Sequence, residues 1–195
     1  MNRDQLKAVK LELTERLKSL ENDFQRAYIN IPENPEIAPS PFPIVMYTMA
    51  ALDLFSSLWS GWSDSKHRGS DTRSQTERMI DFLSAFTNYP TGKSKILVQM
   101  YRHKLMHTSE ARQLLDPSTG NIYLMSISPS LKPKAYLEID KVGKYNWLHL
   151  GVENFINDLK KAIFDKNMYY DQLKKDPKLQ SNFIRCWTEL NSYTL

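Results

Sequence analysis

Apolar residues recur at steps of three and four along the first thirty positions, which is the spacing of one face of an α-helix. The apolar positions are Leu6, Val9, Leu13, Leu17, Leu20, Phe24 and Tyr28. Coiled coils use similar spacing, so this helix can pack on the chain's own core or on a partner helix. We expect a long amphipathic helix over residues 3–30 and a proline-rich loop over 30–43.

The middle of the chain continues this helical patterning. Residues 44–59 are apolar on nearly every face, which predicts a central buried helix. Ser74 and Glu77 form a candidate capping box for a helix that continues to Tyr89, where Pro90 ends it. Further helices are expected over about 92–108, over 152–173 and, after an Asp-Pro start signal at residues 176–177, through Leu190.

The period changes between residues 121 and 150. Short segments rich in Ile, Tyr and Leu lie at 121–128, 134–140 and 145–150, and Pro or Gly separates them. This pattern predicts two or three antiparallel strands. The fold expected is therefore mainly α, an antiparallel bundle of about five to six helices with a small antiparallel β insertion near 121–150. All of it belongs to one domain, divided into an N-terminal helix (1–30), a helical core (42–112), the β elaboration (121–150) and C-terminal helices (151–195).

Composition narrows the class of protein. The chain has 195 residues, 41% of them hydrophobic and 25% charged, with only 6 Gly, which argues against disorder and against a Gly-rich nucleotide-binding loop. The single cysteine, Cys186, excludes an internal disulfide and is expected to be a small buried hydrophobe. The N-terminus lacks the apolar segment of a signal peptide, and Asp53 interrupts the most apolar stretch. We expect a cytoplasmic protein with no membrane association and no cofactor.

The net charge of +4 is unevenly distributed. Residues 61–112 contain nine basic and five acidic side chains, so their net charge of +4 equals that of the whole chain. Residues 61–73 are predicted to form a polar, basic loop. Local positive charge attracts phosphate, although a solvated surface can carry it without any function. The candidate RNA contacts are Lys66, His67, Arg68, Arg73 and Lys104. Trp59 and Trp62 can stack on bases or can pack at the core rim.

One segment of the basic region has chemical interest. At 100° per residue, Ile96, Met100, His103 and His107 share a helix face opposite the ordinary core face, and this second face suits another helix of the same chain or of a second copy. The long side chain of Arg102 can bend toward both imidazoles. One cluster of Arg102, His103 and His107 is therefore feasible.

Such a cluster suits a phosphodiester. Imidazole exchanges protons near neutral pH, and a guanidinium can hold a phosphate oxygen while negative charge develops on it. RNA supplies its own nucleophile, the 2′-hydroxyl, so cleavage would need no metal. Two other interpretations stay open: the three side chains can simply hydrogen-bond neighbouring groups, or His103 and His107, with Glu110 nearby, can bind a metal ion in a hydrolase.

The stretch Tyr101-Arg102-His103-Lys104-Leu105-Met106-His107, together with Arg78-Met-Ile-Asp-Phe-Leu and the Tyr89-Pro90 break, resembles the HEPN superfamily over residues 42–112. The signature of that family is Arg, four to six residues, then His. The resemblance implies an antiparallel helical bundle, often dimeric, in which the Arg–His pairs of two subunits form one metal-independent endoribonuclease site. Such proteins act in toxin–antitoxin, phage-defence and RNA-processing systems, and other members only bind.

The resemblance also implies roles for individual residues. Arg102 would bind the scissile phosphate and His107 would act as general acid and base. His103, which stands where the family often has Asn, would orient the phosphate or the other imidazole. Asp53 would orient an imidazole or pair with Arg102, or else it forms an ordinary ion pair. We expect a homodimeric RNA-binding protein or endoribonuclease, with a non-catalytic interaction protein that engages an antitoxin or another partner as the alternative.

Overall fold

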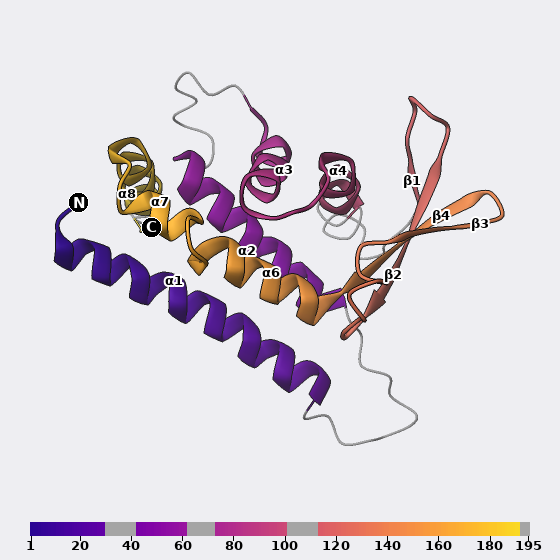
Figure 1. Cartoon of the computed structure of the whole chain (residues 1–195), viewed down its shortest axis with the longest axis horizontal. Helices are drawn as coiled ribbons and strands as arrows, with labels where there is room; N and C mark the ends of the chain where they lie inside the picture. The colour runs from indigo at the N-terminus through magenta and orange to yellow at the C-terminus, as the bar shows by residue number, and fades with distance from the viewer. Residues whose placement is uncertain (30–41, 62–72, 101–112, 192–195) are drawn as a thin grey trace.

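The computed structural model describes residues 1–29, 42–61, 73–100 and 113–191 and shows a mainly helical protein with a small sheet at one end (Figure 1). The helices are α1 (Arg3–Phe24), the π-helix η1 (Gln25–Ile29), α2 (Phe42–Ser60), α3 (Gln75–Phe86), α4 (Thr91–Val98), α6 (Val152–Phe164), α7 (Tyr169–Leu173) and α8 (Pro177–Asn191). The strands are β1 (Leu114–Leu115), β2 (Ile122–Ser128), β3 (Ile139–Val142) and β4 (Tyr145–Gly151).

Helix α1 packs on the chain's own core. Its buried residues are Val9, Leu13, Leu17, Leu20 and Phe24, which belong to the predicted apolar stripe. This stripe faces α2 and α6, and Figure 1 shows α1 lying along both. The expected helix over 3–30 changes from α to π hydrogen bonding at Gln25. The spacing allowed this helix to pack either on the chain's own core or on a partner helix, and in the described residues it packs on the core.

Helix α2 is the centre of the helical part, as its all-round apolar sequence predicted. It contacts α1, α3, α6 and α8. Val45, Leu52 and Phe55 are completely buried, and so is the polar Thr48, whose hydroxyl donates to the carbonyl of Ile44 at 2.7 Å. Because this internal bond satisfies the hydroxyl, Thr48 can be buried at little cost.

The sheet differs from the antiparallel one predicted. Its order is β1-β2-β4-β3, with β2 and β4 parallel and the other two pairs antiparallel. Residues 129–138 cross from the end of β2 to the start of β3 near the same end of the sheet, so that β4 lies between β2 and β3. The side-chain oxygen and amide of Asn154, in α6, bond the backbone N–H and carbonyl of Leu131 at 2.9 and 3.1 Å and hold this crossover.

Three expected strand and helix boundaries were wrong. Helix α3, expected to continue to Tyr89, ends at Phe86, and Thr87 is already extended. The predicted strand 134–140 is a turn over residues 133–137, and β3 begins only at Ile139. The helical spacing over 152–173 is two helices, because the chain leaves α6 after Phe164 and Asn167 adopts a positive φ of 67° before α7. The start of α8 is as predicted, since Asp176 Oδ1 accepts the backbone N–H of Lys178 at 2.8 Å.

Cys186 is completely buried, as its spacing predicted. Burial raises the pKa of its thiol to about 12, which keeps the sulfur protonated. In the part of the chain that the structure describes, no helix is both long and apolar enough to cross a membrane.

Leu13→Ala and Leu11→Ala form a matched pair on α1. Leu13 is 1% exposed and Leu11 is 63% exposed. We expect Leu13→Ala to lower the free energy of unfolding by about 3 kcal/mol, because truncation leaves a cavity, and Leu11→Ala to change it by less than about 0.5 kcal/mol. Urea denaturation followed by circular dichroism measures both. Equal effects would contradict the packing of α1 on its own core.

Candidate functional site

The structure describes two of the predicted site residues, Asp53 in α2 and Arg73 immediately before α3. The others lie outside the described residues: Arg102, His103, Lys104 and His107 of the Arg–His segment, and Lys66, His67 and Arg68 of the basic loop. Trp62 lies outside them as well. The described part of the candidate site therefore has two components. One is the polar layer between α2 and α3, formed by Asp53, Ser57, Gln75 and Arg78, and the other is α4, the helix that precedes Arg102 in the sequence.

Helix α4 leads directly toward the Arg–His segment. Leu97, Val98 and Met100 are completely buried, so the end of the helix is held firmly in the protein. Gln99 and Met100 have π-helical hydrogen bonding rather than α-helical. The face predicted for Ile96, Met100, His103 and His107 continues into residues outside the described ranges and stays a prediction. Short π-helical segments are frequent at functional sites.

Gln75 links α2 and α3 at the centre of the polar layer. Its amide nitrogen donates to the carboxylate of Asp53 and to Ser57 Oγ, the latter at 2.8 Å. Its side-chain oxygen accepts from Arg78 Nε at 3.1 Å. The Asp53 carboxylate, predicted to orient an imidazole or to pair with Arg102, thus contacts an amide from the first turn of α3.

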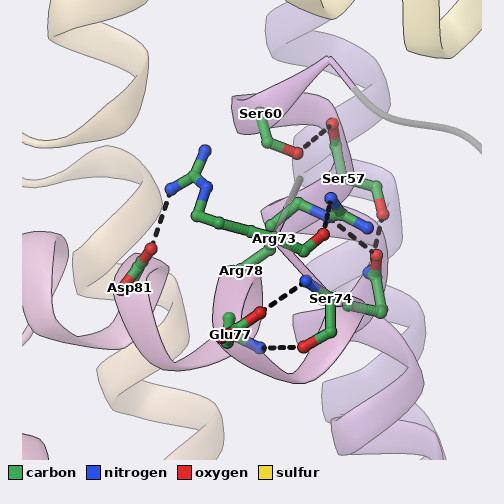
Figure 2. A network of polar contacts seen from close by, with 8 residues as sticks. Ser57, Ser60, Arg73, Ser74, Glu77, Arg78 and Asp81 are labelled. Atoms are coloured by element: carbon green, nitrogen blue, oxygen red, sulfur yellow. Dashed lines mark hydrogen bonds and ion pairs between the residues drawn. The ribbon is translucent and has the colours of Figure 1, made fainter. Parts of the chain in front are cut away.

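Arg78 is the largest fully buried side chain of this layer. Besides Gln75 it bonds the backbone carbonyl of Arg73, which accepts from Nη1 at 2.5 Å (Figure 2). A buried guanidinium is costly unless its N–H groups are bonded. Arg78 therefore ties the end of the basic loop, at Arg73, to the polar layer beneath it.

Arg73 itself points away from Arg78 and along the outside of α3 (Figure 2). Its Nη1 is 2.8 Å from Asp81 Oδ2, and its guanidinium carbon lies 5.6 Å from the centroid of the Trp59 ring. Trp59 packs edge-on against Phe82 and Phe86 at 6.1 and 5.9 Å, so it lies at the rim of the core. Arg73 remains 39% exposed and can still reach an anion.

The predicted capping box at the start of α3 is confirmed. Ser74 Oγ accepts from the backbone N–H of Glu77 at 3.2 Å, and Glu77 Oε2 accepts from the backbone N–H of Ser74 at 2.6 Å. These bonds from the backbone and hydroxyl of Ser74 lower the pKa of Glu77, with a smaller contribution from the neighbouring guanidinium groups.

A second polar cluster holds the start of α4. The Tyr89 hydroxyl donates to Asp158 Oδ2 in α6 at 2.7 Å and also contacts the Tyr136 hydroxyl from the crossover before β3. Burial raises the pKa of both phenols, so they stay protonated hydrogen-bond donors. The break between α3 and α4 is thereby attached to α6 and to the crossover before β3.

The chemistry available to the described groups is limited. Guanidinium groups do not deprotonate in proteins, so the partly exposed Arg73 can bind an anion but cannot transfer protons, and Arg78 is completely buried. Among the described residues, no three His, Cys, Asp or Glu side chains come together to hold a metal ion.

Sequence reasoning missed the structural roles of Gln75, Arg78 and Tyr89. Arg78 lies four residues before Phe82 and eight before Phe86, so helical spacing already places it on the apolar face of α3. That position was the available signal for a buried, bonded arginine. No comparable signal pairs Tyr89 with Tyr136 and Asp158, which are distant in the sequence.

Arg78→Ala and Arg73→Ala test the polar layer. We expect Arg78→Ala to lower the free energy of unfolding by about 3 kcal/mol, because it leaves buried partners unbonded. Arg73→Ala, which removes a partly exposed ion pair, should cost less than about 1 kcal/mol. Urea denaturation at neutral pH gives both values. A cost for Arg78→Ala no larger than that for Arg73→Ala would rule out the assigned role of Arg78.

Glu77→Gln tests the capping box through its pH dependence. Because the folded protein lowers the pKa of Glu77, its carboxylate stabilises the fold above the unfolded pKa, and this contribution disappears as the pH falls through the folded value. We expect wild type to be more stable than Glu77→Gln at pH 7, with the difference closing toward pH 3. Thermal melts across this range measure the difference, and a gap that does not change with pH would contradict the bonding described.

Comparison of the chain with models of protein families, with curated protein sequences and with solved structures finds no match. The function must therefore be argued from this chain's own residues.

Proposed function

We propose that this protein is an RNA-binding, metal-independent endoribonuclease that acts through Arg102 and His107. The observation that carries the proposal is the Arg-x4-His sequence, which follows closely on α4, a helix whose last residues are buried, in a mainly helical protein. The same pattern is the signature of the HEPN superfamily. The finer architecture that we propose with it is an antiparallel HEPN-like bundle that pairs as a homodimer.

In the proposed reaction, the RNA 2′-hydroxyl oxygen attacks the adjacent phosphorus and the bond to the 5′-oxygen of the next nucleotide breaks. His107 serves as general acid and base, so that the 2′-hydroxyl proton is removed and the departing 5′-oxygen is protonated. Arg102 binds the phosphate oxygens that gain charge in the transition state. His103 orients the phosphate or the second imidazole. The products are a 2′,3′-cyclic phosphate and a 5′-hydroxyl end.

The described residues support this proposal in two ways. The Tyr89–Asp158 bond and the buried residues Leu97, Val98 and Met100 hold α4 in place, which a site at its end requires. Arg78 holds the backbone of Arg73 at the end of the basic loop, beside the Asp53 layer. In the proposal, Arg73 joins Lys66, His67, Arg68 and Lys104 as RNA contacts.

The biological setting that we propose is defence or a toxin–antitoxin pair, in which a partner protein neutralises the nuclease. A non-catalytic protein with the same sequence pattern would bind such a partner without cutting RNA. A metal-dependent hydrolase using His103 and His107 would lose its activity in chelator. These alternatives give different results in the cleavage experiment.

The direct experiment compares wild type, Arg102→Ala and His107→Ala on end-labelled single-stranded RNA in EDTA. We expect wild type to cleave and both variants to be at least about 100-fold slower, since general acid–base catalysis contributes about 10²–10⁴ in rate. His149→Ala is the matched control. This histidine lies in β4 with its Nε2 3.0 Å from Asp140, outside the Arg–His segment, and its loss should leave the rate unchanged.

Fluorescence anisotropy with labelled RNA, run on the same four proteins, separates binding from cleavage. His107→Ala should keep its affinity for RNA, because its proposed role is proton transfer. Absence of cleavage by wild type, or equal cleavage by wild type and His107→Ala, would overturn the nuclease proposal. Cleavage that requires an added divalent metal would instead favour the hydrolase.

A further inference from the structure

A pocket of about 330 Å³ lies between α1, α6 and α7, helices that Figure 1 shows side by side. Its apolar lining comes from Leu17 of α1, Phe164 of α6 and Tyr170 of α7. Its charged lining comprises Lys10, Lys18, Lys160, Lys174, Glu21 and Asp171. The volume lies within the range of about 300–1,000 Å³ that small-molecule sites occupy.

The lysines give this pocket a cationic character that Glu21, Asp171 and Glu15, which is 3.2 Å from Lys18 Nζ, only partly offset. Lys160 Nζ is 2.6 Å from Glu21 Oε1, an ion pair that joins α6 to α1, and Lys174 Nζ is 2.5 Å from Asp171 Oδ1. These lysine side chains are 52% and 42% exposed, so the pairs are solvated and can exchange partners at little cost. Among the described residues, Lys10 forms no ion pair and is available to an anion.

The aromatic wall of the pocket is fixed before any ligand arrives. The Tyr170 hydroxyl donates to the backbone carbonyl of Leu6 at 3.0 Å, which sets the position of its ring. Phe164 packs against this ring with centroids 6.0 Å apart and planes at 65°. Lys174 Nζ lies 5.2 Å from the Tyr170 centroid. A flat ring can therefore pack beside a cation without reordering the side chains that receive it.

The mixture of groups selects the ligand. Lysines suit a phosphate, and the aromatic wall suits a planar base. Glu21 and Asp171 would repel a polyanion, but they can accept hydrogen bonds from ribose hydroxyls or from a base amino group. A fatty acid would bring no hydrogen-bond donor to these carboxylates, whose present donors are Lys160, Lys174 and the backbone N–H of Asn167. We propose that this pocket binds a nucleoside 5′-monophosphate, either free or as the 5′ end of an RNA.

This proposal goes beyond the nuclease proposal, because none of the lining residues belongs to the Arg102–His107 segment. The binding experiment uses the full chain carrying His107→Ala, which removes the proposed catalytic proton transfer. Loss of nuclease activity therefore does not affect its outcome.

Isothermal titration calorimetry at about 50 mM salt compares adenosine 5′-monophosphate, adenosine and inorganic phosphate. We expect saturable binding of the nucleotide at one site per chain, with adenosine and phosphate at least about 10-fold weaker, because each lacks half of the recognised groups. The double variant Lys10→Gln/Lys174→Gln should weaken nucleotide binding at least about 5-fold. Phe164→Leu, which keeps an apolar side chain but removes the ring, should also weaken it.

Lys7→Gln is the matched control. Lys7 lies on α1 and pairs with Asp4, but it does not line the pocket, so its neutralisation should leave nucleotide affinity unchanged. Circular dichroism confirms that each variant is folded. The proposal is overturned by absence of saturable nucleotide binding, by equal affinity for inorganic phosphate, or by an equal loss in Lys7→Gln and in the double lysine variant.

Competition distinguishes the two sources of the ligand. A dinucleotide RNA with a 5′-phosphate should displace the mononucleotide if the pocket accepts an RNA end, and the same dinucleotide without that phosphate should not. If neither dinucleotide competes, the pocket takes the free nucleotide. Both results support recognition of a nucleoside monophosphate, whereas equal competition by both dinucleotides contradicts it.

Discussion

The need to cover most of α2 determines how the other helices are arranged, and only a strip of its first half, at Pro43, Tyr47 and Ala50, is exposed among its described side chains. A helix that is apolar on nearly every face is stabilised by burying most of its surface, because exposed apolar side chains lose the free energy of burial. The neighbours α1, α3, α6 and α8 supply the cover. All four of these helices have one apolar and one polar face, so each can cover one side of α2 and present charged residues to water. The hydrophobic effect thus determines which helices pack on α2. The polar faces of those helices are exposed to water and can take part in function.

The polar layer between α2 and α3 is the exception within this apolar arrangement. Asp53, Gln75 and Arg78 place a carboxylate, an amide and a guanidinium close to the central helix. An apolar layer would avoid the desolvation of these groups. The polar layer makes the packing of α3 on α2 directional, because hydrogen bonds require particular atoms to meet. The layer therefore sets the rotation of α3 about its axis and holds the backbone of Arg73. Nonpolar contacts alone are less directional.

Local patterns in the sequence predicted the local features of the fold. The stripe on α1, the apolar α2, the capping box at Ser74 and the start of α8 at Asp176 all depend on residues a few positions apart, and each is confirmed. Strand order was not predictable in this way. The parallel pairing of β2 with β4 depends on the path of residues 129–138 and on the hold of Asn154 on Leu131, contacts that periodicity does not encode.

The same distinction between local patterns and contacts of distant residues applies to the candidate site. The capping box beside the basic loop follows from residue spacing, and the burial of Arg78 could have been inferred from its place on the apolar face of α3. The attachment of Tyr89 to Tyr136 and Asp158 joins residues 47 and 69 positions apart, so only the folded chain brings them together. The Arg102, His103 and His107 roles stay predictions, since these residues lie outside the described ranges.

The passage from β4 into α6 has a mechanical consequence. Gly151 ends the strand and Val152 begins the helix, so no linker residue separates the sheet from the helical core. A Cβ at Gly151 would collide with the side chain of Asn154, the same residue that holds the crossover at Leu131. Strand β4 therefore passes into the core helix α6 without a flexible connection between them. Torque applied to the β3–β4 hairpin reaches α6, and through Asp158 the beginning of α4, without being absorbed in a hinge.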